Sequence, residues 1–202
     1  TMVDKAGNSQ EFKAGDVHFL DLNGNGIIEE DDREIIGDPN PDIYGNIFAT
    51  LNWKNLTLSA NFTYSMGNDV FNYQRMMLNS GSNFWNQQVA ETGHWRYEGQ
   101  QTDIPRLNYG DPMGNNRFSD RWIEDGSYLR LRSLKLNYRV PVNFSWLQGL
   151  SVWAEATNLF TLTKYLGSDP EFAMSGAVLG QGIDLGRLGQ SRSIVAGVKI
   201  NL

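Results

Sequence analysis

The chain of 202 residues contains no cysteine, which excludes a disulfide framework and thiolate metal sites. It has no apolar run of the roughly eighteen residues that a membrane helix needs. No run of Lys and Arg is interleaved with aromatics, and the net charge is −6, so nucleic acid is not an expected partner. The start at Thr1 lacks the basic and apolar parts of a signal peptide, and we expect a fragment or a processed piece.

Helical periodicity is also nearly absent, and strict alternation takes its place. In the segment 56–66, "LTLSANFTYSM", every second residue is apolar and the residues between are Thr, Ser or Asn. This pattern predicts a strand with one apolar and one polar face. The same reading predicts an all-β, antiparallel fold. Its expected strands cover about 43–53, 56–66, 128–140, 150–163 and 191–202.

One expected strand contains an irregularity. In "YLRLRSLKLNYRV", 128–140, the apolar phase slips between Leu131 and Leu134. A β-bulge near Arg132–Ser133 would repair the slip, because one extra residue on one strand restores the alternation. The repaired strand carries a ladder of basic residues on its polar face, namely Arg130, Arg132, Lys135 and Arg139.

Alternation alone fits both a soluble sandwich and a membrane barrel. The connections discriminate better, since short links at 54–55 and 141–149 alternate with long ones at 67–126 and 164–190. Short turns on one side and long loops on the other are typical of outer-membrane barrels. A membrane barrel needs at least about eight strands, so these strands would be part of a larger barrel.

Aromatic and basic residues agree with a barrel. On the apolar faces, Trp53 and Tyr138 fall beside the short turns, and Tyr64 and Phe160 fall beside the long loops. This distribution is typical of two interfacial girdles, although ordinary strand propensity also favours aromatics. The basic ladder would be costly toward lipid and cheap toward a wet lumen; a solvated sheet face is the alternative.

Four stretches carry a resemblance to a known family. They are "GDVHFLDLNGNGIIEEDDREIIGDPNPDIYG" (15–45), "RWIEDGSYLRLRSLKLNYRVP" (121–141), "NLFTLTKYLGSDPE" (158–171) and "QSRSIVAGVKINL" (190–202). In this order they resemble the C-terminal portion of the SusC/RagA-type TonB-linked outer-membrane transporters of Bacteroidetes. One departure is visible, because the chain ends on Leu202 where the family usually has an aromatic residue.

The resemblance implies a transmembrane barrel of about twenty-two strands in the bacterial outer membrane, with a plug and a TonB box outside this chain. It implies a SusD-like surface lipoprotein as partner, TonB as the source of energy, outer-membrane lipid around the barrel, and oligosaccharides or peptides as cargo. It places the loops 67–126 and 164–190 outside the cell, together with the region 1–42. No enzymatic activity is expected.

The stretch "DLNGNGIIEEDD", 21–32, follows the spacing of an EF-hand loop. The expected ligands are Asp21, Asn23, Asn25, the Ile27 carbonyl, Glu29 and Asp32. Ca²⁺ would act structurally by pinning the loop. Asp32 replaces the usual bidentate Glu and reaches less far, so Mg²⁺ or weak binding is an alternative. A metal-free Asx-turn loop is another, because Asn and Gly favour turns.

Five aromatic residues in the longest loop are candidate contacts for cargo, since aromatic rings are common at binding surfaces. They are Trp85, Trp95, Tyr97, Tyr109 and Trp122. The alternative is that they pack the loop against itself.

Two other functions compete with transport. One is a soluble or surface-attached, calcium-stabilised β-domain that binds glycans, as an adhesin or lectin would. The other, ranked last, is a glycan-active enzyme, which would need two placed carboxylates. A transporter would stay in the outer-membrane fraction and need detergent, whereas a lectin-like domain would be soluble without it.

Overall fold

The computed structural model describes residues 2–3, 9–172 and 180–202. The chain divides into two compact units, one formed by 1–37 with 71–123 and the other by 38–70 with 124–202. Because the described ranges leave out 4–8 and 173–179, the expected region 1–42 and the expected loop 164–190 lie partly outside the described residues. The described part of the chain contains no helix with the length and hydropathy of a membrane-spanning segment.

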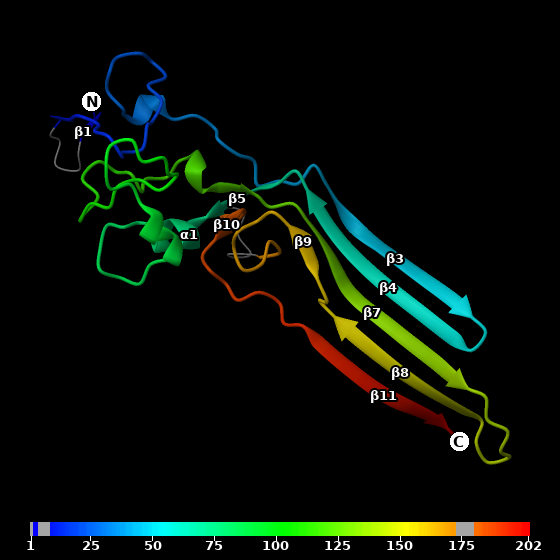
Figure 1. Cartoon of the computed structure of the whole chain (residues 1–202). Coiled ribbons are helices and arrows are strands. Elements are labelled where there is room, and N and C mark those ends of the chain that lie inside the picture. Colours follow the sequence, from blue (N-terminus) through cyan, green and yellow to red (C-terminus); the bar gives the residue numbers. More distant parts are fainter. Residues whose placement is uncertain (1, 4–8, 173–179) are drawn as a thin grey trace. The chain divides into compact units, whose positions relative to one another are not determined.

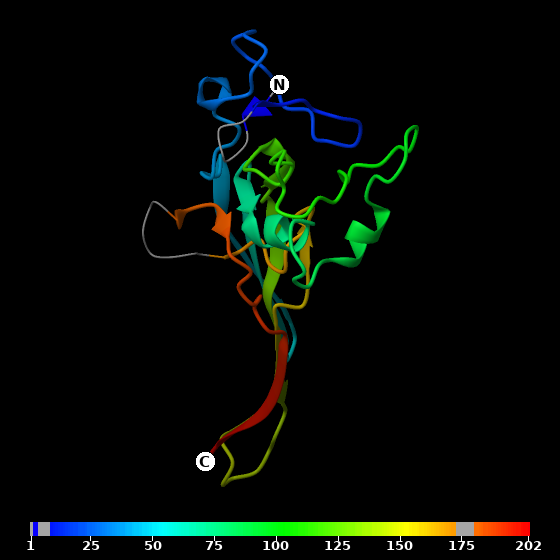
Figure 2. The ribbon, with the colours of Figure 1, turned by 90° about the vertical axis from the view of Figure 1, so that its left-hand side faces the viewer.

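The second unit is built on an antiparallel sheet with the strand order β11-β8-β7-β4-β3 (Figure 1). These strands are β3 (Ile43–Trp53), β4 (Leu56–Met66), β7 (Tyr128–Val140), β8 (Gly149–Thr157) and β11 (Ser193–Asn201). The antiparallel all-β class predicted from alternation is confirmed. In Figure 2 the β7–β8 connection and the C-terminus lie at the same end of this sheet.

The hairpin β3–β4 forms where the sequence places only two residues between strands. Its register runs without interruption from Trp53↔Leu56 to Ile43↔Met66. Lys54 adopts φ 53°, the left-handed conformation that two-residue hairpin turns use. The Lys54 ammonium lies 5.3 Å from the Trp53 ring centroid, so the turn residue also covers the last residue of β3.

The predicted bulge in β7 is confirmed. Asn61 of β4 pairs with Ser133, and the next residue, Phe62, pairs with Leu131. Arg132 is therefore the extra residue on the bulged strand. Residues on either side of it keep their faces, and leucines of both halves of β7 align with the apolar face of β4.

The structure differs from the single strand expected at 150–163. Strand β8 ends at Thr157, and the short strand β9 (Thr161–Thr163) pairs with the first residues of β7 instead. Asn158 at the break has φ 51°, a conformation that Asn tolerates better than most residues. The break lies opposite the bulge, since the Asn158 backbone N–H donates to the Arg132 carbonyl at 3.0 Å. The bulge disturbs the ladder here, and the neighbouring strand bends with it.

The remaining elements are short. They are β1 (Met2–Val3), β2 (Ser9–Gln10), η1 (Glu30–Asp32), β5 (Asp69–Asn72), α1 (Tyr73–Leu78), η2 (Val89–Gly93), η3 (Asp120–Trp122), β6 (Ile123–Asp125) and β10 (Ile183–Asp184). Strands β10, β5 and β6 form a three-stranded sheet in that order. The long connection 67–126 thus contains secondary structure of its own, including α1, whose first turn is capped by the Asn72 side chain.

In the first unit, Met113 and Trp122 are buried. The Trp122 indole N–H donates to the Arg117 carbonyl at 3.0 Å, and the Arg121 guanidinium lies 4.5 Å from its ring centroid. Trp122 thus packs the long connection from within, with its one polar atom satisfied.

Candidate functional site

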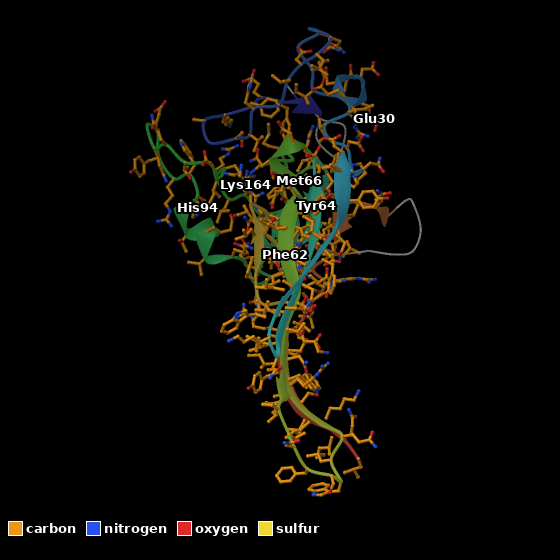
Figure 3. All side chains as sticks on the ribbon, turned by 90° about the vertical axis from the view of Figure 1, so that its right-hand side faces the viewer. Glu30, Phe62, Tyr64, Met66, His94 and Lys164 are labelled. Atoms are coloured by element: carbon orange, nitrogen blue, oxygen red, sulfur yellow. The ribbon has the colours of Figure 1, made fainter. Side chains whose placement is uncertain are left out.

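The first feature of interest is the apolar face of the sheet. Strand register aligns one row of residues across it, namely Trp53, Leu56, Tyr138, Val152 and Val198. Trp53 is 65% exposed and Val198 61%, and other large apolar residues of the face are exposed as well. In Figure 3, Phe62, Tyr64 and Met66 mark successive positions of this face on β4. An exposed apolar surface of this extent indicates contact with lipid or with another apolar body.

The opposite face of the sheet is polar and charged. Lys135 forms an ion pair with Glu155 at 3.4 Å, and its ammonium lies 4.9 Å from the Trp153 ring centroid. The Trp153 indole covers Gly197 on the edge strand β11, where an added Cβ would lie 2.8 Å from the ring. Farther along, Arg139 and Lys199 flank Ser151 in the strand register. The two faces therefore separate apolar from charged groups, as the sequence pattern predicted.

A buried ion network ties β7 to the connection before β11. The Arg130 side chain is 3% exposed and pairs with Asp169, while its Nη1 lies 3.0 Å from Glu171 Oε2. Arg132 pairs with the same Glu171 oxygen at 2.9 Å. Asp169 also accepts hydrogen bonds from the backbone amides of Glu171 and Gln190 at 2.8 and 2.9 Å. The buried pair Arg130–Asp169 is thus matched in charge, as buried charges require, and the partly exposed Glu171 and Arg132 extend it toward the surface.

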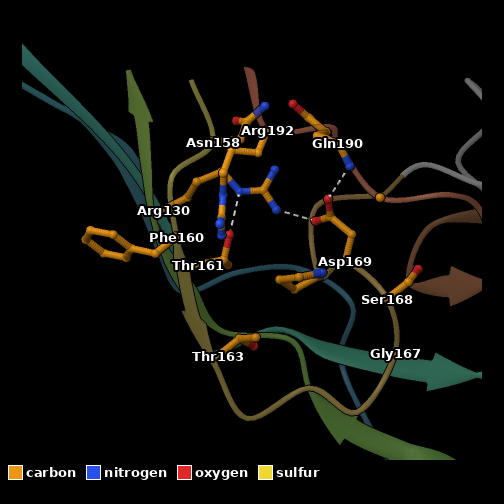
Figure 4. Close-up of a pocket in the computed structure, with 12 residues that line it drawn as sticks. Arg130, Asn158, Phe160, Thr161, Thr163, Gly167, Ser168, Asp169, Gln190 and Arg192 are labelled. Atoms are coloured by element: carbon orange, nitrogen blue, oxygen red, sulfur yellow. Dashed lines mark hydrogen bonds and ion pairs between the residues drawn. The ribbon is translucent and has the colours of Figure 1, made fainter. Parts of the chain in front are cut away.

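A pocket of about 370 Å³ opens beside this network (Figure 4). Its lining includes polar side chains from β7, from β9 and the residues between β8 and β9, and from the connection before β11, among them Arg130, Asn158, Thr161, Asp169, Gln190 and Arg192. In Figure 4 the Phe160 ring points to the other side of the strand from Asp169. The volume lies within the range of small-molecule sites.

The described part of the connection 164–190 has its own buried contact. The Tyr165 hydroxyl donates to Asp184, and both side chains are buried. Burial, the hydrogen bond to Asp184 and its negative charge raise the pKa of Tyr165. Tyr165 stacks on Phe172 with ring centroids 6.2 Å apart. These contacts fold the connection back on itself, and the ion pair of Asp169 with Arg130 ties it to β7.

The predicted metal ligands lie in a compact turn. The Asp21 carboxylate accepts hydrogen bonds from three backbone amides, those of Gly24 at 2.7 Å, Asn25 at 3.2 Å and Gly26 at 2.7 Å. The Asn25 side-chain nitrogen donates to the Glu29 carboxylate at 2.8 Å. Asn23 accepts from the Asn25 amide and Asn25 from the Ile27 amide. Gly24 and Gly26 have φ of 73° and 81°, which these turns require.

Asp32 closes the same turn. It accepts from the amides of Glu29 at 2.8 Å and Leu22 at 2.9 Å, and the hydrogen bond from Glu29 is the main cause that lowers the Asp32 pKa. Among the described residues, no three Asp, Glu or His side chains converge into a preformed metal cluster. The metal assignment remains a prediction, because these hydrogen bonds can form the turn with or without an ion.

The five aromatic candidates differ in exposure. Trp85, Tyr97 and Tyr109 are exposed, Trp95 is partly exposed and Trp122 is fully buried. The Tyr109 ring lies 5.3 Å from Phe84, and the Gly110 amide donates to the Ser82 carbonyl. The exposed members keep their predicted role as candidates, whereas Trp122 in this structure is a packing residue.

The ion network and the pocket were not anticipated from the sequence. Asp169 lies 39 residues from Arg130, so no local spacing connects them. A partial signal existed in the basic ladder of β7, because two arginines near the bulge need counter-charges if they are buried. The acidic pair in "SDPE", 168–171, could have supplied them.

Comparison with known proteins identifies similar chains. No family model matches the sequence. The chain is 36% identical over 156 residues to TonB-dependent receptor P3 of Formosa agariphila, an alignment that covers 76% of this chain and 15% of that protein. It is 27% identical over 158 residues to TonB-dependent receptor SusC of Bacteroides thetaiotaomicron, again over 76% of this chain and 15% of the relative.

A comparison with solved structures also finds similarity to a transporter of this kind. The fold matches a chain of the RagAB peptide importer in the closed-closed state with a TM-score of 0.70 and 27% sequence identity, over 98% of this chain and 20% of that one. The chain therefore spans about 15–20% of the length of the proteins that it matches.

Proposed function

Because the chain belongs to the SusC/RagA-type TonB-dependent receptors, we propose that the full-length protein is an outer-membrane importer and that this sheet is part of its barrel wall. The observation that carries the proposal is the exposed apolar face, continuous in register across β3, β4, β7, β8 and β11. Lipid would cover that face, and the charged face would line a wet lumen.

The proposed cargo is an oligosaccharide or a peptide. Similarity to SusC and to a chain of the RagAB peptide importer supports a SusD-like lipoprotein as partner of the full-length protein. TonB would supply energy through regions outside this chain. The connections 67–126 and 164–190 would then face the cell exterior, because the short turns 54–55 and 141–148 lie at the opposite ends of the strands. We expect no enzymatic activity.

The loop 21–32 would bind Ca²⁺ in a structural role at the cell exterior. Its side-chain oxygens already surround one turn, and a hard cation would add to the constraint that the backbone hydrogen bonds impose.

The proposal is tested by uptake. Cells of the native host that lack the receptor gene should lose accumulation of one class of labelled oligosaccharide or peptide, and the full-length gene should restore it. An uncoupler that collapses the proton gradient should abolish the restored uptake. Restored uptake that survives the uncoupler, or a deletion without effect on any cargo of either class, would refute an energised importer.

The lectin-like alternative is not favoured, since the similar proteins are TonB-dependent receptors. It would regain support if the full-length protein were extracted from cells without detergent.

A further inference from the structure

The lining of the pocket beside Arg130 carries more positive than negative side chains. Its lining contains two guanidinium groups, Arg130 and Arg192, against one carboxylate, Asp169. Arg130 is held by Asp169 and Glu171. Arg192 is exposed, and no described residue forms an ion pair with it. One positive charge at the rim is therefore available to a ligand.

Two further side chains of the lining can still donate a hydrogen bond to a ligand. The Thr161 hydroxyl accepts from Arg130 Nε at 3.0 Å, so its own proton is free to donate. Gln190 uses its side-chain oxygen to accept from Arg132 at 3.1 Å, and no described residue accepts from its side-chain nitrogen. A guanidinium, a hydroxyl and an amide nitrogen thus remain as donors around one space.

An unsatisfied acceptor completes the set. Asn158 Nδ2 donates to the Ser191 carbonyl at 3.0 Å, which fixes the amide group, and its Oδ1 is buried without a hydrogen-bond partner among the described residues. Buried polar atoms are nearly always paired with protein, water or ligand. A ligand that supplies a hydrogen-bond donor next to its anionic group would pair this oxygen.

From these groups we infer that the pocket binds a carboxylate of the cargo together with a neighbouring N–H or O–H donor. Arg192, Thr161 and Gln190 would hold the carboxylate, and Asn158 Oδ1 would accept from the donor. This inference rests on the proposed function, which puts the polar face of β7 in the path of the cargo. Two cargo sources share the chemistry, a uronic acid of an oligosaccharide and the C-terminus of a peptide.

The buried network would give this subsite its rigidity. Asp169 accepts from the Gln190 backbone amide and Arg132 donates to the Gln190 side-chain oxygen, while Arg130 donates to the Thr161 hydroxyl, so two of the ligand donors are held before binding. A preorganised site loses less conformational entropy when it binds. The subsite therefore discriminates by charge more sharply than scattered surface arginines would.

The test measures binding by isothermal titration calorimetry to the full-length receptor purified in detergent. One arm compares trigalacturonate with its neutral methyl ester, and the other compares tri-alanine with its C-terminal amide. In one of the two arms, the carboxylate form should bind at least about tenfold more tightly, since hydrogen bonds to a charged group contribute that much. The arm that shows the difference identifies the source.

Three variants make the test specific. Arg192→Gln should abolish the preference for the carboxylate form, and Asn158→Asp should also weaken it by adding a like charge to a residue that tolerates φ 51°. Arg139→Gln removes an exposed charge from the far end of the same polar face and should keep the preference. Amounts of each variant in the outer membrane serve as the folding control.

Equal binding of the acidic and neutral probes in both arms would overturn the inference. An equal loss in Arg139→Gln would do so as well, because it would show general attraction by the basic face. The calorimetry uses purified receptor and does not depend on energised uptake. The proposed function is refuted by a different result, namely the absence of uncoupler-sensitive uptake in cells.

Discussion

Arg130 is a buried charge on a strand. Its side chain is 3% exposed beside two carboxylates, while the nearby pair Lys135–Glu155 on the same strand is 46% and 32% exposed. A buried ion pair is costly to break, because the remaining charge stays desolvated. An exposed pair contributes little, because water already solvates both partners.

This contrast predicts the effect of two isosteric substitutions. In the full-length receptor, Asp169→Asn should lower the unfolding free energy by about 3 kcal/mol and expose the connection before β11 to protease. Glu155→Gln should cost less than ~1 kcal/mol. Urea unfolding followed by tryptophan fluorescence measures both. Similar small effects of the two variants would contradict a stabilising role for the buried network.

Asp16 makes stability depend on pH in the first unit. Burial alone would raise the Asp16 pKa, but hydrogen bonds from Asn115, the Lys13 amide and Arg106 outweigh it, and the pKa is lowered. Arg106 binds the carboxylate through two nitrogens at 2.7 and 2.9 Å. A lowered acid pKa contributes stability that is complete above the unfolded value of about 4 and is lost as pH falls through the folded value.

We therefore expect the Arg106 and Val17 amides, which are hydrogen-bonded in this cluster, to lose exchange protection only below about pH 4. Hydrogen exchange, corrected for the intrinsic rate at each pH, provides the measurement. Asp16→Asn should show the unprotected state already at pH 7. Protection that stays constant down to pH 2 would mean that this carboxylate does not hold the cluster.

At the scale of elements, the sequence predicted what alternation encodes and missed what distant pairing decides. The bulge at Arg132 was visible because the leucine phase slips at that point. The end of β8 was not visible, because residues after Asn158 keep the alternation while the backbone leaves the ladder. The pocket was missed because Asp169 meets Arg130 only through the tertiary fold.

The bulge interpretation predicts opposite outcomes for two single deletions. Deleting Arg132 removes the extra residue and should keep both faces of β7, so the full-length receptor should still reach the outer membrane. Deleting Ser59 from the regular strand β4 shifts one half of it by one residue and moves apolar side chains to the polar face. Immunoblots of outer-membrane fractions should show the receptor only in the first case. Presence of both variants at the parental level would refute this account.

The turn 21–32 is tested with terbium as a calcium substitute. Sensitised luminescence of the full-length receptor should saturate, and Asp21→Ala should reduce it at least tenfold, because it removes a central ligand. Asp31→Ala is the matched control, since this exposed carboxylate of the same turn lies outside the predicted ligand set. Absence of a saturable signal in the parent at millimolar ion would leave an ion-free turn held by its backbone hydrogen bonds alone.

At the scale of the whole molecule, the sheet has two edge strands, β3 and β11. Each edge leaves backbone donors and acceptors that need partners, and a membrane barrel provides them by closure. The chain's share of 15–20% of its relatives' length agrees with a wall segment whose remaining strands come from elsewhere in the full-length protein. The direction in which the sheet curves to close the barrel would also decide which of its two faces meets lipid.

The orientation of the two faces gives the last prediction. Leu136 and Val198 lie on the apolar face, and their neighbours Asn137 and Lys199 lie on the polar one. In a cysteine-free full-length receptor, spin labels at Leu136→Cys and Val198→Cys should collide mainly with oxygen dissolved in the membrane. Labels at Asn137→Cys and Lys199→Cys should collide less with oxygen, because the charged face would meet water or protein rather than acyl chains. Labels on the apolar face that are shielded from oxygen, or that meet a water-soluble nickel complex more often than oxygen, would show that protein or water covers it. The sheet could not then be the lipid-facing wall of an importer.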